Sequence, residues 1–286
     1  MKIAIIGSKG QLGSELKKAL NRHETIPIDH DTIEVSDRNS CNIIQEKKPD
    51  IVINTAAYHK TDACEDNPRK AFSVNAIGAK NITDICKKNG AISVYISTDY
   101  VFDGTKNTPY TETDTSNPIN TYGISKLAGE QYTKLAEKHY IIRTSSLFGI
   151  NPPRGKGSNF IDKIIKKAQE EKEIKVVEDI ITSPTYAKDV ADMIKVVLEN
   201  QLPYGTYHIT NSGYCSWYQF AKSIIETTSL NTTIKATKAE KNTTGAKRPI
   251  FSALKSTNLE RHNLKMRNWK DALNDYLEEK NQKNTP

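Results

Sequence analysis

The first half of the chain alternates between short apolar runs and longer amphipathic segments. The apolar runs are rich in Ile and Val and show no polar alternation, which is typical of strands in a parallel sheet covered on both faces. They predict strands at residues 2–7, 24–29, 50–58, 91–98 and 140–145. The amphipathic segments predict helices at residues 10–20, 38–48, 68–90 and 120–139. This order of elements predicts a doubly wound α/β fold.

After about Ser146 the alternation loosens. Loops containing Gly, Pro, Asn and Thr separate helices predicted at 158–172, 186–200, 216–228 and 268–280. The polar tail after residue 280 is expected to fray. The change predicts a dinucleotide-binding Rossmann domain over residues 1–145. A smaller, mainly substrate-binding lobe is predicted over 146–286, and some of its segments could return to the main sheet.

Composition narrows the class of protein. No run approaches the roughly 18 apolar residues of a membrane helix, and no apolar signal segment follows Met1. We therefore expect a soluble, cytoplasmic protein with no membrane partner. The four cysteines are far apart and the six histidines are scattered, so reduced thiols and no metal site are expected.

The chain carries a net charge of +7, with an isoelectric point near 9.0. Its lysines are spread along the whole length rather than gathered in an arm or tail, which argues against a nucleic-acid partner. Diffuse positive charge instead suits an anionic small molecule, such as a nucleotide with a diphosphate.

A glycine-rich loop joins the first predicted strand to the first predicted helix. Gly7 allows a tight turn, Gly10 lets the backbone approach a phosphate, and Gly13 lets the helix pack against the sheet. The start of the helix offers free backbone N–H groups to a pyrophosphate. The loop predicts dinucleotide binding, and a purely structural turn is the alternative.

Asp29 closes the second predicted strand. An acidic residue there usually accepts hydrogen bonds from the adenosine ribose, which favours NADH over NADPH. Arg22 and His30 lie nearby and could accommodate a 2′-phosphate, so NADPH and NADH both stay candidates. The alternative is a solvated loop aspartate.

Tyr122 and Lys126 are four residues apart on a predicted helix, and hence on one face. A tyrosine hydroxyl can protonate the alkoxide formed when a ketone is reduced, and a nearby ammonium lowers the tyrosine pKa. Thr98 ends the strand before this helix, where its hydroxyl could bind the substrate carbonyl. In the alternative reading, Thr98 and Asp99 only shape the turn that follows.

Several longer motifs follow one another in a recognisable order. They are NTAAY at 54–58, STDYVFDG at 97–104, PINTYGISKLAGE at 118–130, RTSSLFG at 143–149, SPTY at 183–186, GTYHITNSGYCSWYQFA at 205–221 and RPIFSAL at 248–254. Together with the glycine loop, this set resembles the extended short-chain dehydrogenase/reductases. Within them it is most similar to the dTDP-4-dehydrorhamnose reductases, and the resemblance covers nearly the whole chain.

The resemblance implies a reaction and a set of site residues. The reaction is NAD(P)H-dependent reduction of the 4-keto group of dTDP-4-dehydro-L-rhamnose, a step in surface polysaccharide synthesis, by a cytoplasmic enzyme that could form a homodimer. The implied catalytic residues are Thr98, Tyr122 and Lys126. The cofactor-binding residues are Gly7, Gly10, Gln11, Leu12, Asp29, Glu34, Val35, Ala56, Ala57, Tyr58, Tyr122 and Lys126. The substrate-binding residues are Thr98, Asp99, Tyr100, Ser146 and Arg248, whose guanidinium suits a diphosphate.

Three features of the sequence bear on the alternatives. Ser146 stands where similar reductases carry a tryptophan near the sugar, so a reductase of a different 4-keto nucleotide sugar is the main alternative. Asp99-Tyr100 replaces the Asp-Glu pair of related dehydratases, which argues against dehydration. The complete catalytic set argues against a non-catalytic regulatory subunit.

Some members of the family carry a magnesium ion at a dimer interface. Glu15 could match one of its ligands, but the remaining ligands have no counterpart that we can place. An ordinary carboxylate on the first helix is the simpler interpretation, and we predict no metal.

Overall fold

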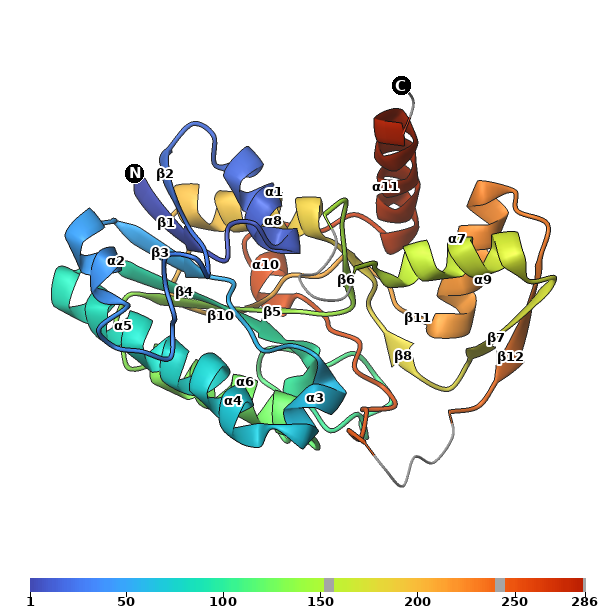
Figure 1. The fold of residues 1–286 in the computed structure, drawn as a ribbon, viewed down its shortest axis with the longest axis horizontal. Coiled ribbons are helices and arrows are strands. Elements are labelled where there is room, and N and C mark those ends of the chain that lie inside the picture. The colour runs from blue at the N-terminus through green and yellow to red at the C-terminus, as the bar shows by residue number, and fades with distance from the viewer. Residues whose placement is uncertain (152–156, 240–244, 285–286) are drawn as a thin grey trace.

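A parallel sheet forms the centre of the computed structural model, which describes residues 1–151, 157–239 and 245–284 (Figure 1). Its strand order is β10-β5-β4-β3-β1-β2. The strands are β1 (Lys2–Ile6), β2 (Glu24–Ile28), β3 (Ile51–Asn54), β4 (Ile92–Thr98), β5 (His139–Thr144) and β10 (Gly205–His208). The strand order reverses between the neighbouring strands β1 and β3, as at the switch point of Rossmann folds, so the predicted fold class is confirmed.

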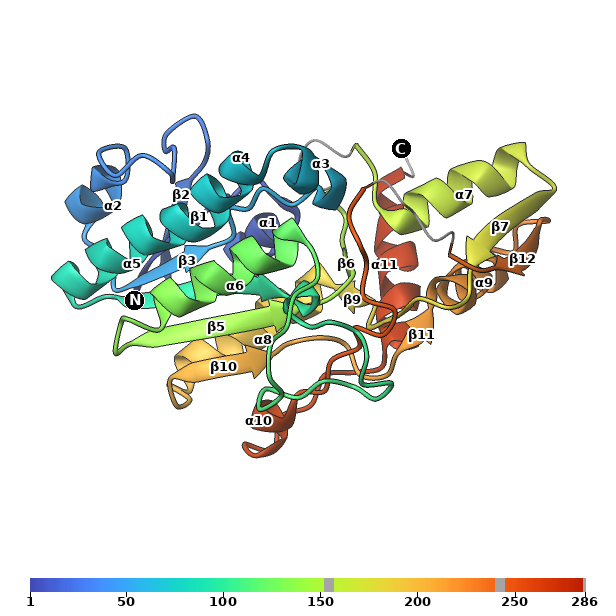
Figure 2. The same ribbon diagram turned by 90° about the horizontal axis from the view of Figure 1, so that it is seen from below.

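Helices cover both faces of this sheet (Figures 1 and 2). Successive side chains of a strand point to opposite faces. Ile3 and Ile5 of β1 therefore join the core beneath α1 (Gln11–Ala19) and α8 (Ala187–Glu199). Ala4 and Ile6 join the core on the other face, which includes residues of α2 (Asn42–Lys47) and α5 (Gly78–Asn89). Burial on both faces explains why β1 shows no polar alternation.

The helix predicted at 68–90 is interrupted. It consists of α4 (Pro68–Phe72), a π-helical turn (Ser73–Ile77) and α5. A π turn leaves backbone groups outside the ordinary helical ladder, often at functional sites. Here the Asn75 carbonyl accepts a hydrogen bond from the Tyr95 hydroxyl (2.8 Å). The sequence pattern did not predict this turn or the short α3 (Thr61–Asp66).

The strand predicted at 50–58 ends early, at Asn54. The Asn54 side chain accepts a hydrogen bond from the Ala56 backbone N–H (3.1 Å), which turns the chain out of the sheet. The helix predicted at 38–48 is likewise shorter, since only Asn42–Lys47 is helical.

A second core lies beside the sheet. Phe148, Phe220, Trp269 and Tyr276 pack together at its centre. The elements around it or near it are β6 (Leu147–Phe148), α7 (Phe160–Glu170), β7 (Glu173–Val177), β8 (Ile181–Thr182), β9 (Thr185–Tyr186), β11 (Cys215–Ser216), α9 (Trp217–Thr228), β12 (Thr233–Thr237) and α11 (Trp269–Asn284). α10 (Thr257–Glu260) lies apart from them, next to β10.

Parts of the second half do join the main sheet. β10 pairs with β5, and α8 packs against α1. The division of the chain at residue 145 stays a prediction. The expectation that the tail frays after residue 280 is wrong for residues 281–284, because α11 continues to Asn284.

The four cysteines are buried, and none of them is in a disulfide. Burial raises the pKa of Cys41, Cys86 and Cys215 to about 12, so these thiols are protonated and unreactive at neutral pH. Within the ranges that the structure describes, no helix is both long and apolar enough to cross a membrane.

Candidate active site

A cavity of about 900 Å³ opens at the carboxyl ends of β1, β3, β4 and β5. This edge is where doubly wound sheets bind ligands. The cavity is lined by the glycine loop, residues 55–61, α6 (Thr121–Thr133), residues 144–148 and parts of α7 and α9. Every site residue inferred from the sequence lines it, except Arg248.

The glycine loop leaves room for a phosphate. Gly7 has a φ of +80°, and a Cβ there would lie 2.5 Å from the Thr55 hydroxyl. A Cβ on Gly13 would lie 2.2 Å from the Gly7 carbonyl oxygen. The helix can therefore approach the loop this closely only because residue 13 is glycine. α1 begins at Gln11 with Gly10 as its cap, and Gly10 offers no side chain to the first N–H groups. The residues present therefore fit a pyrophosphate.

Asp29 is buried against this loop. Its carboxylate accepts hydrogen bonds from the Ser8 hydroxyl (2.5 Å) and the Lys9 backbone N–H (2.9 Å). The alternative reading of a solvated loop aspartate is therefore wrong. Asp29 shapes the loop and also lines the cavity, and its contact with a ribose stays a prediction.

The predicted adenine end of the site lies at Glu34 and Val35. The Glu34 carboxylate accepts a hydrogen bond from the Ser36 hydroxyl (2.7 Å), and Val35 is buried. Ala56, Ala57 and Tyr58 follow β3 along the cavity wall. The Asn75 side chain holds the Tyr58 backbone at both N–H (2.8 Å) and carbonyl (3.0 Å).

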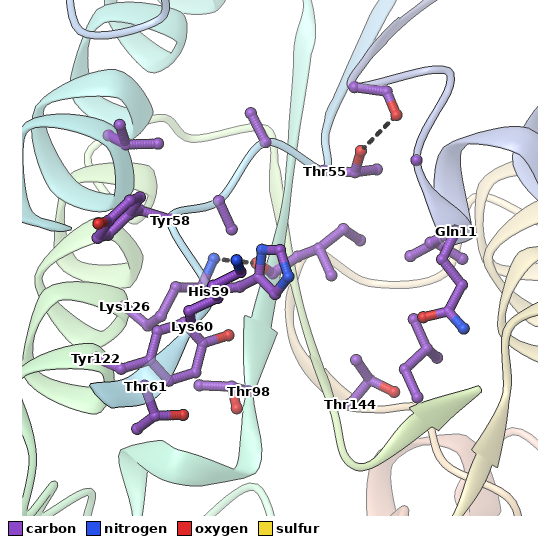
Figure 3. Close-up of a pocket in the computed structure, with 18 of the residues that line it drawn as sticks. Gln11, Thr55, Tyr58, His59, Lys60, Thr61, Thr98, Tyr122, Lys126 and Thr144 are labelled. Atoms are coloured by element: carbon purple, nitrogen blue, oxygen red, sulfur yellow. Dashed lines mark hydrogen bonds between the residues drawn. The ribbon is translucent and has the colours of Figure 1, made fainter. Parts of the chain in front are cut away.

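Thr98, Tyr122 and Lys126 converge on one side of the cavity (Figure 3). Thr98 is the last residue of β4, and the other two lie one turn apart on α6. Asn120 caps α6 by accepting a hydrogen bond from the Gly123 N–H (2.8 Å). A Cβ on Gly123 would lie 2.1 Å from the Tyr100 carbonyl oxygen, so glycine allows the helix to approach the end of β4.

Lys126 is buried beneath the cavity. Its ammonium donates a hydrogen bond to the Ile96 carbonyl (2.5 Å) and lies 4.0 Å from the centre of the Tyr95 ring. Burial lowers the pKa of Lys126 to about 7, although the negative charge of Glu130 acts against this shift.

The Tyr122 hydroxyl is also buried. Burial raises its pKa, and the Asp99 charge adds to this, while a hydrogen bond with Thr98 acts the other way. From the sequence we expected Lys126 to lower the pKa of Tyr122. In this structure burial dominates instead, and Tyr122 holds its proton at neutral pH.

Asp99 links three segments beneath the site. Its carboxylate accepts hydrogen bonds from the hydroxyls of Ser252 (2.5 Å), Ser145 (2.9 Å) and Thr98 (3.0 Å). Burial raises the pKa of Asp99 to about 6 despite these bonds. The neighbouring Tyr100 ring meets the Tyr122 ring edge-on at 5.9 Å. Substrate contacts of Asp99 and Tyr100 stay predictions.

The remaining two substrate residues differ in position. Ser146 lines the cavity in a left-handed backbone conformation (φ +43°), with its hydroxyl 2.5 Å from that of Thr182. Arg248 lies outside the cavity lining, where its guanidinium donates a hydrogen bond to Asp62 of α3 (2.8 Å). A phosphate-binding role for Arg248 therefore requires the guanidinium to exchange this partner.

The sequence motifs did not mark two aromatic residues that line the cavity. Phe160 and Trp217 form an apolar wall contributed by α7 and α9, with ring centres 4.5 Å apart.

Glu130 could have been singled out from the sequence, because it continues the four-residue spacing of Tyr122 and Lys126. It is fully buried and forms an ion pair with Arg143 (2.7 Å).

Glu15 is buried on α1 and forms an ion pair with Lys18 (2.8 Å). No group of three or more His, Cys, Asp or Glu side chains in the described parts of the chain could hold a metal ion.

The chain is similar to known proteins over most of its length. A sequence model of the family described as "RmlD substrate binding domain" matches residues 1–282. The spore coat polysaccharide biosynthesis protein SpsK of Bacillus subtilis is 38% identical over 283 residues, covering 98% of each chain. The dTDP-4-dehydrorhamnose reductase of Burkholderia thailandensis is 35% identical and covers 79% of this chain and 78% of its own.

Solved structures agree. A dTDP-4-dehydrorhamnose reductase from Clostridium acetobutylicum superposes with a TM-score of 0.92 at 39% identity, covering 97% of this chain and 99% of its own. The Bacillus anthracis dTDP-4-dehydrorhamnose reductase, solved in complex with NADP, superposes with a TM-score of 0.91 at 37% identity and with the same coverage. This chain belongs to the RmlD substrate-binding domain family, the family of the dTDP-4-dehydrorhamnose reductases.

Proposed function

We propose that this chain reduces the 4-keto group of dTDP-4-dehydro-L-rhamnose to dTDP-L-rhamnose with NADPH or NADH. The observation that carries the proposal is the convergence of Thr98, Tyr122 and Lys126 on the cavity that also contains the glycine loop. The names of the relatives point to the same chemistry, and one of them was solved with NADP.

The residues divide the work of the reduction. When bound, the nicotinamide cofactor supplies the hydride to the carbonyl carbon. Tyr122, protonated at neutral pH, donates its hydroxyl proton to the carbonyl oxygen as negative charge develops there, so one O–H bond breaks and another forms. Thr98 orients the carbonyl, and the Lys126 ammonium stabilises the phenolate left on Tyr122.

A second candidate substrate is a different 4-keto nucleotide sugar. Ser146 favours it, because serine lacks the flat apolar surface that tryptophan offers a sugar ring. Trp217 and Phe160 supply an apolar wall to the same cavity, which supports the first candidate.

Cofactor oxidation in the presence of nucleotide sugars tests the proposal. Purified protein is mixed with dTDP-4-dehydro-L-rhamnose and either NADPH or NADH, and the loss of nicotinamide absorbance is followed. Sugar-dependent oxidation that yields dTDP-L-rhamnose is expected. Oxidation only with another 4-keto sugar would establish the second candidate, and no oxidation with any sugar would contradict both.

We also propose a cytoplasmic location and a homodimer in solution. Light scattering of the purified chain checks the second statement, and a monomeric mass would contradict it.

A further inference from the structure

Two polar groups in the cavity wall are buried without a partner. They are the side-chain nitrogen of Gln11 and the hydroxyl of Thr144, and neither has a hydrogen-bond partner among the described residues. Each residue is only 8% exposed, and both line the cavity. Buried polar groups in native proteins are almost always paired, so an unpaired couple facing a cavity indicates a polar ligand.

The neighbouring hydroxyls differ in this respect. The Ser145 hydroxyl donates to Asp99 (2.9 Å), and the Ser146 hydroxyl lies 2.5 Å from that of Thr182. Across the cavity, the Thr55 hydroxyl donates to the Ile6 carbonyl (2.7 Å). The missing partner is therefore a property of Thr144 and not of this stretch of chain.

The position of the pair limits what can reach it. Gln11 is the first residue of α1, directly after the phosphate loop, and Thr144 is the last residue of β5. Figure 3 shows both on one side of the cavity, opposite Tyr122 and Lys126. A dinucleotide with its pyrophosphate at Gly10 and its second ribose near Lys126 would place its redox ring between these two walls.

The chemistry of the pair matches one substituent of that ring. A carboxamide has one carbonyl acceptor and one NH₂ donor. The Gln11 side chain can donate to the carbonyl, and the Thr144 oxygen can accept from the NH₂. The geometry points to Gln11 and Thr144 as the residues that hold the nicotinamide carboxamide and so fix which face of the ring meets Thr98 and Tyr122. This inference rests on the proposed function, because it assumes a nicotinamide cofactor.

Binding measurements on Thr144→Val test it without turnover. Valine keeps the shape of threonine and removes the hydroxyl. By isothermal titration calorimetry, NADPH binding should weaken about three- to ten-fold, the size expected for one neutral hydrogen bond. The 3-acetylpyridine analogue lacks the NH₂ and 2′-phospho-ADP-ribose lacks the ring, so binding of both should be unchanged.

Two further variants sharpen the result. Gln11→Met should weaken both NADPH and the acetylpyridine analogue, since both keep the carbonyl. Thr133→Val is the matched control, because its buried hydroxyl donates to the Gly129 carbonyl (2.9 Å) away from the cavity. It should lower the melting temperature and leave all three affinities unchanged. Thr144→Val should melt no lower than the wild type, because its hydroxyl has no partner to lose.

The outcomes separate the two claims. Equal NADPH affinity in wild type and Thr144→Val would overturn this inference and leave the proposed function standing. Equal weakening of all three ligands in Thr144→Val would also overturn it, since that would indicate a general distortion. A wild-type protein that binds none of the ligands would overturn the proposed function and this inference with it.

Discussion

At the scale of single residues, burial has more effect on the pKa values of the catalytic side chains than their neighbouring charges have. Lys126 and Tyr122 lie one helical turn apart, yet the pKa of each is shifted mainly by burial away from water. Burial disfavours the charged form of both side chains. Tyr122 therefore keeps its proton, and Lys126 loses its proton near neutral pH. Glu130, one turn further along α6, is the charge that opposes this loss at Lys126.

This arrangement predicts a pH dependence. Lys126 has a pKa of about 7 in the free enzyme and is charged only below it, so kcat/KM should fall as the pH rises through about 7. Glu130 raises the Lys126 pKa, and Glu130→Gln should therefore move this fall to lower pH, by roughly one unit. A pH profile of kcat/KM measures both.

Ser97→Ala is the control for this shift. It removes the 2.5 Å hydrogen bond to Glu130 and leaves the charge in place. Its profile should stay near that of the wild type. An unmoved profile in Glu130→Gln would contradict the role given to the Glu130 charge.

At the scale of elements, close approach between α6 and the end of β4 brings the catalytic residues together. Gly123 permits this approach, since any side chain there would collide with the Tyr100 backbone. Asn120 and Glu65 hold the start of the helix, with Glu65 accepting the Thr121 N–H (2.8 Å). The helix is thus positioned by its first turn.

Gly123→Ala should push α6 away from β4. We expect a loss of about 1–3 kcal/mol in the free energy of unfolding and a fall in kcat of roughly a hundred-fold. Denaturant unfolding and steady-state kinetics measure the two effects. Ile124→Ala, at the adjacent and exposed position, should change neither much. Wild-type kcat in Gly123→Ala would contradict the account.

The same elements show how far the sequence could be interpreted. Apolar runs predicted β1 and β4, and glycine spacing predicted the loop before α1, because these signals are local. The π turn at Asn75 depends on partners distant in sequence, Tyr58 and Tyr95, which no local pattern reveals. The depth of burial that shifts Lys126 is likewise a tertiary property.

At the scale of the whole molecule, the two halves of the chain share one sheet. β10 and α8 come from the second half and complete the sheet and its helical cover. The residues that the sequence motifs proposed as catalytic lie together on one side of the cavity. The motifs did not indicate the wall formed by Phe160 and Trp217, because aromatic residues at helical spacing are usually core.

This sharing predicts that residues 1–145 do not fold alone. The fragment would expose the β1 and α1 side chains that pack against Val190 and Ile194 of α8. We expect it to lack a cooperative thermal transition in circular dichroism, whereas the full chain should show one. A sharp transition in the fragment would contradict this prediction and support residue 145 as a true domain boundary.

The most direct measurement on the central claim is the comparison of turnover and cofactor affinity in Tyr122→Phe. The hydroxyl is the proton donor, and its removal leaves the ring, the helix and the glycine loop in place. The account predicts a kcat lowered at least about a hundred-fold with an NADPH dissociation constant close to that of the wild type. Near wild-type turnover in this variant would contradict it.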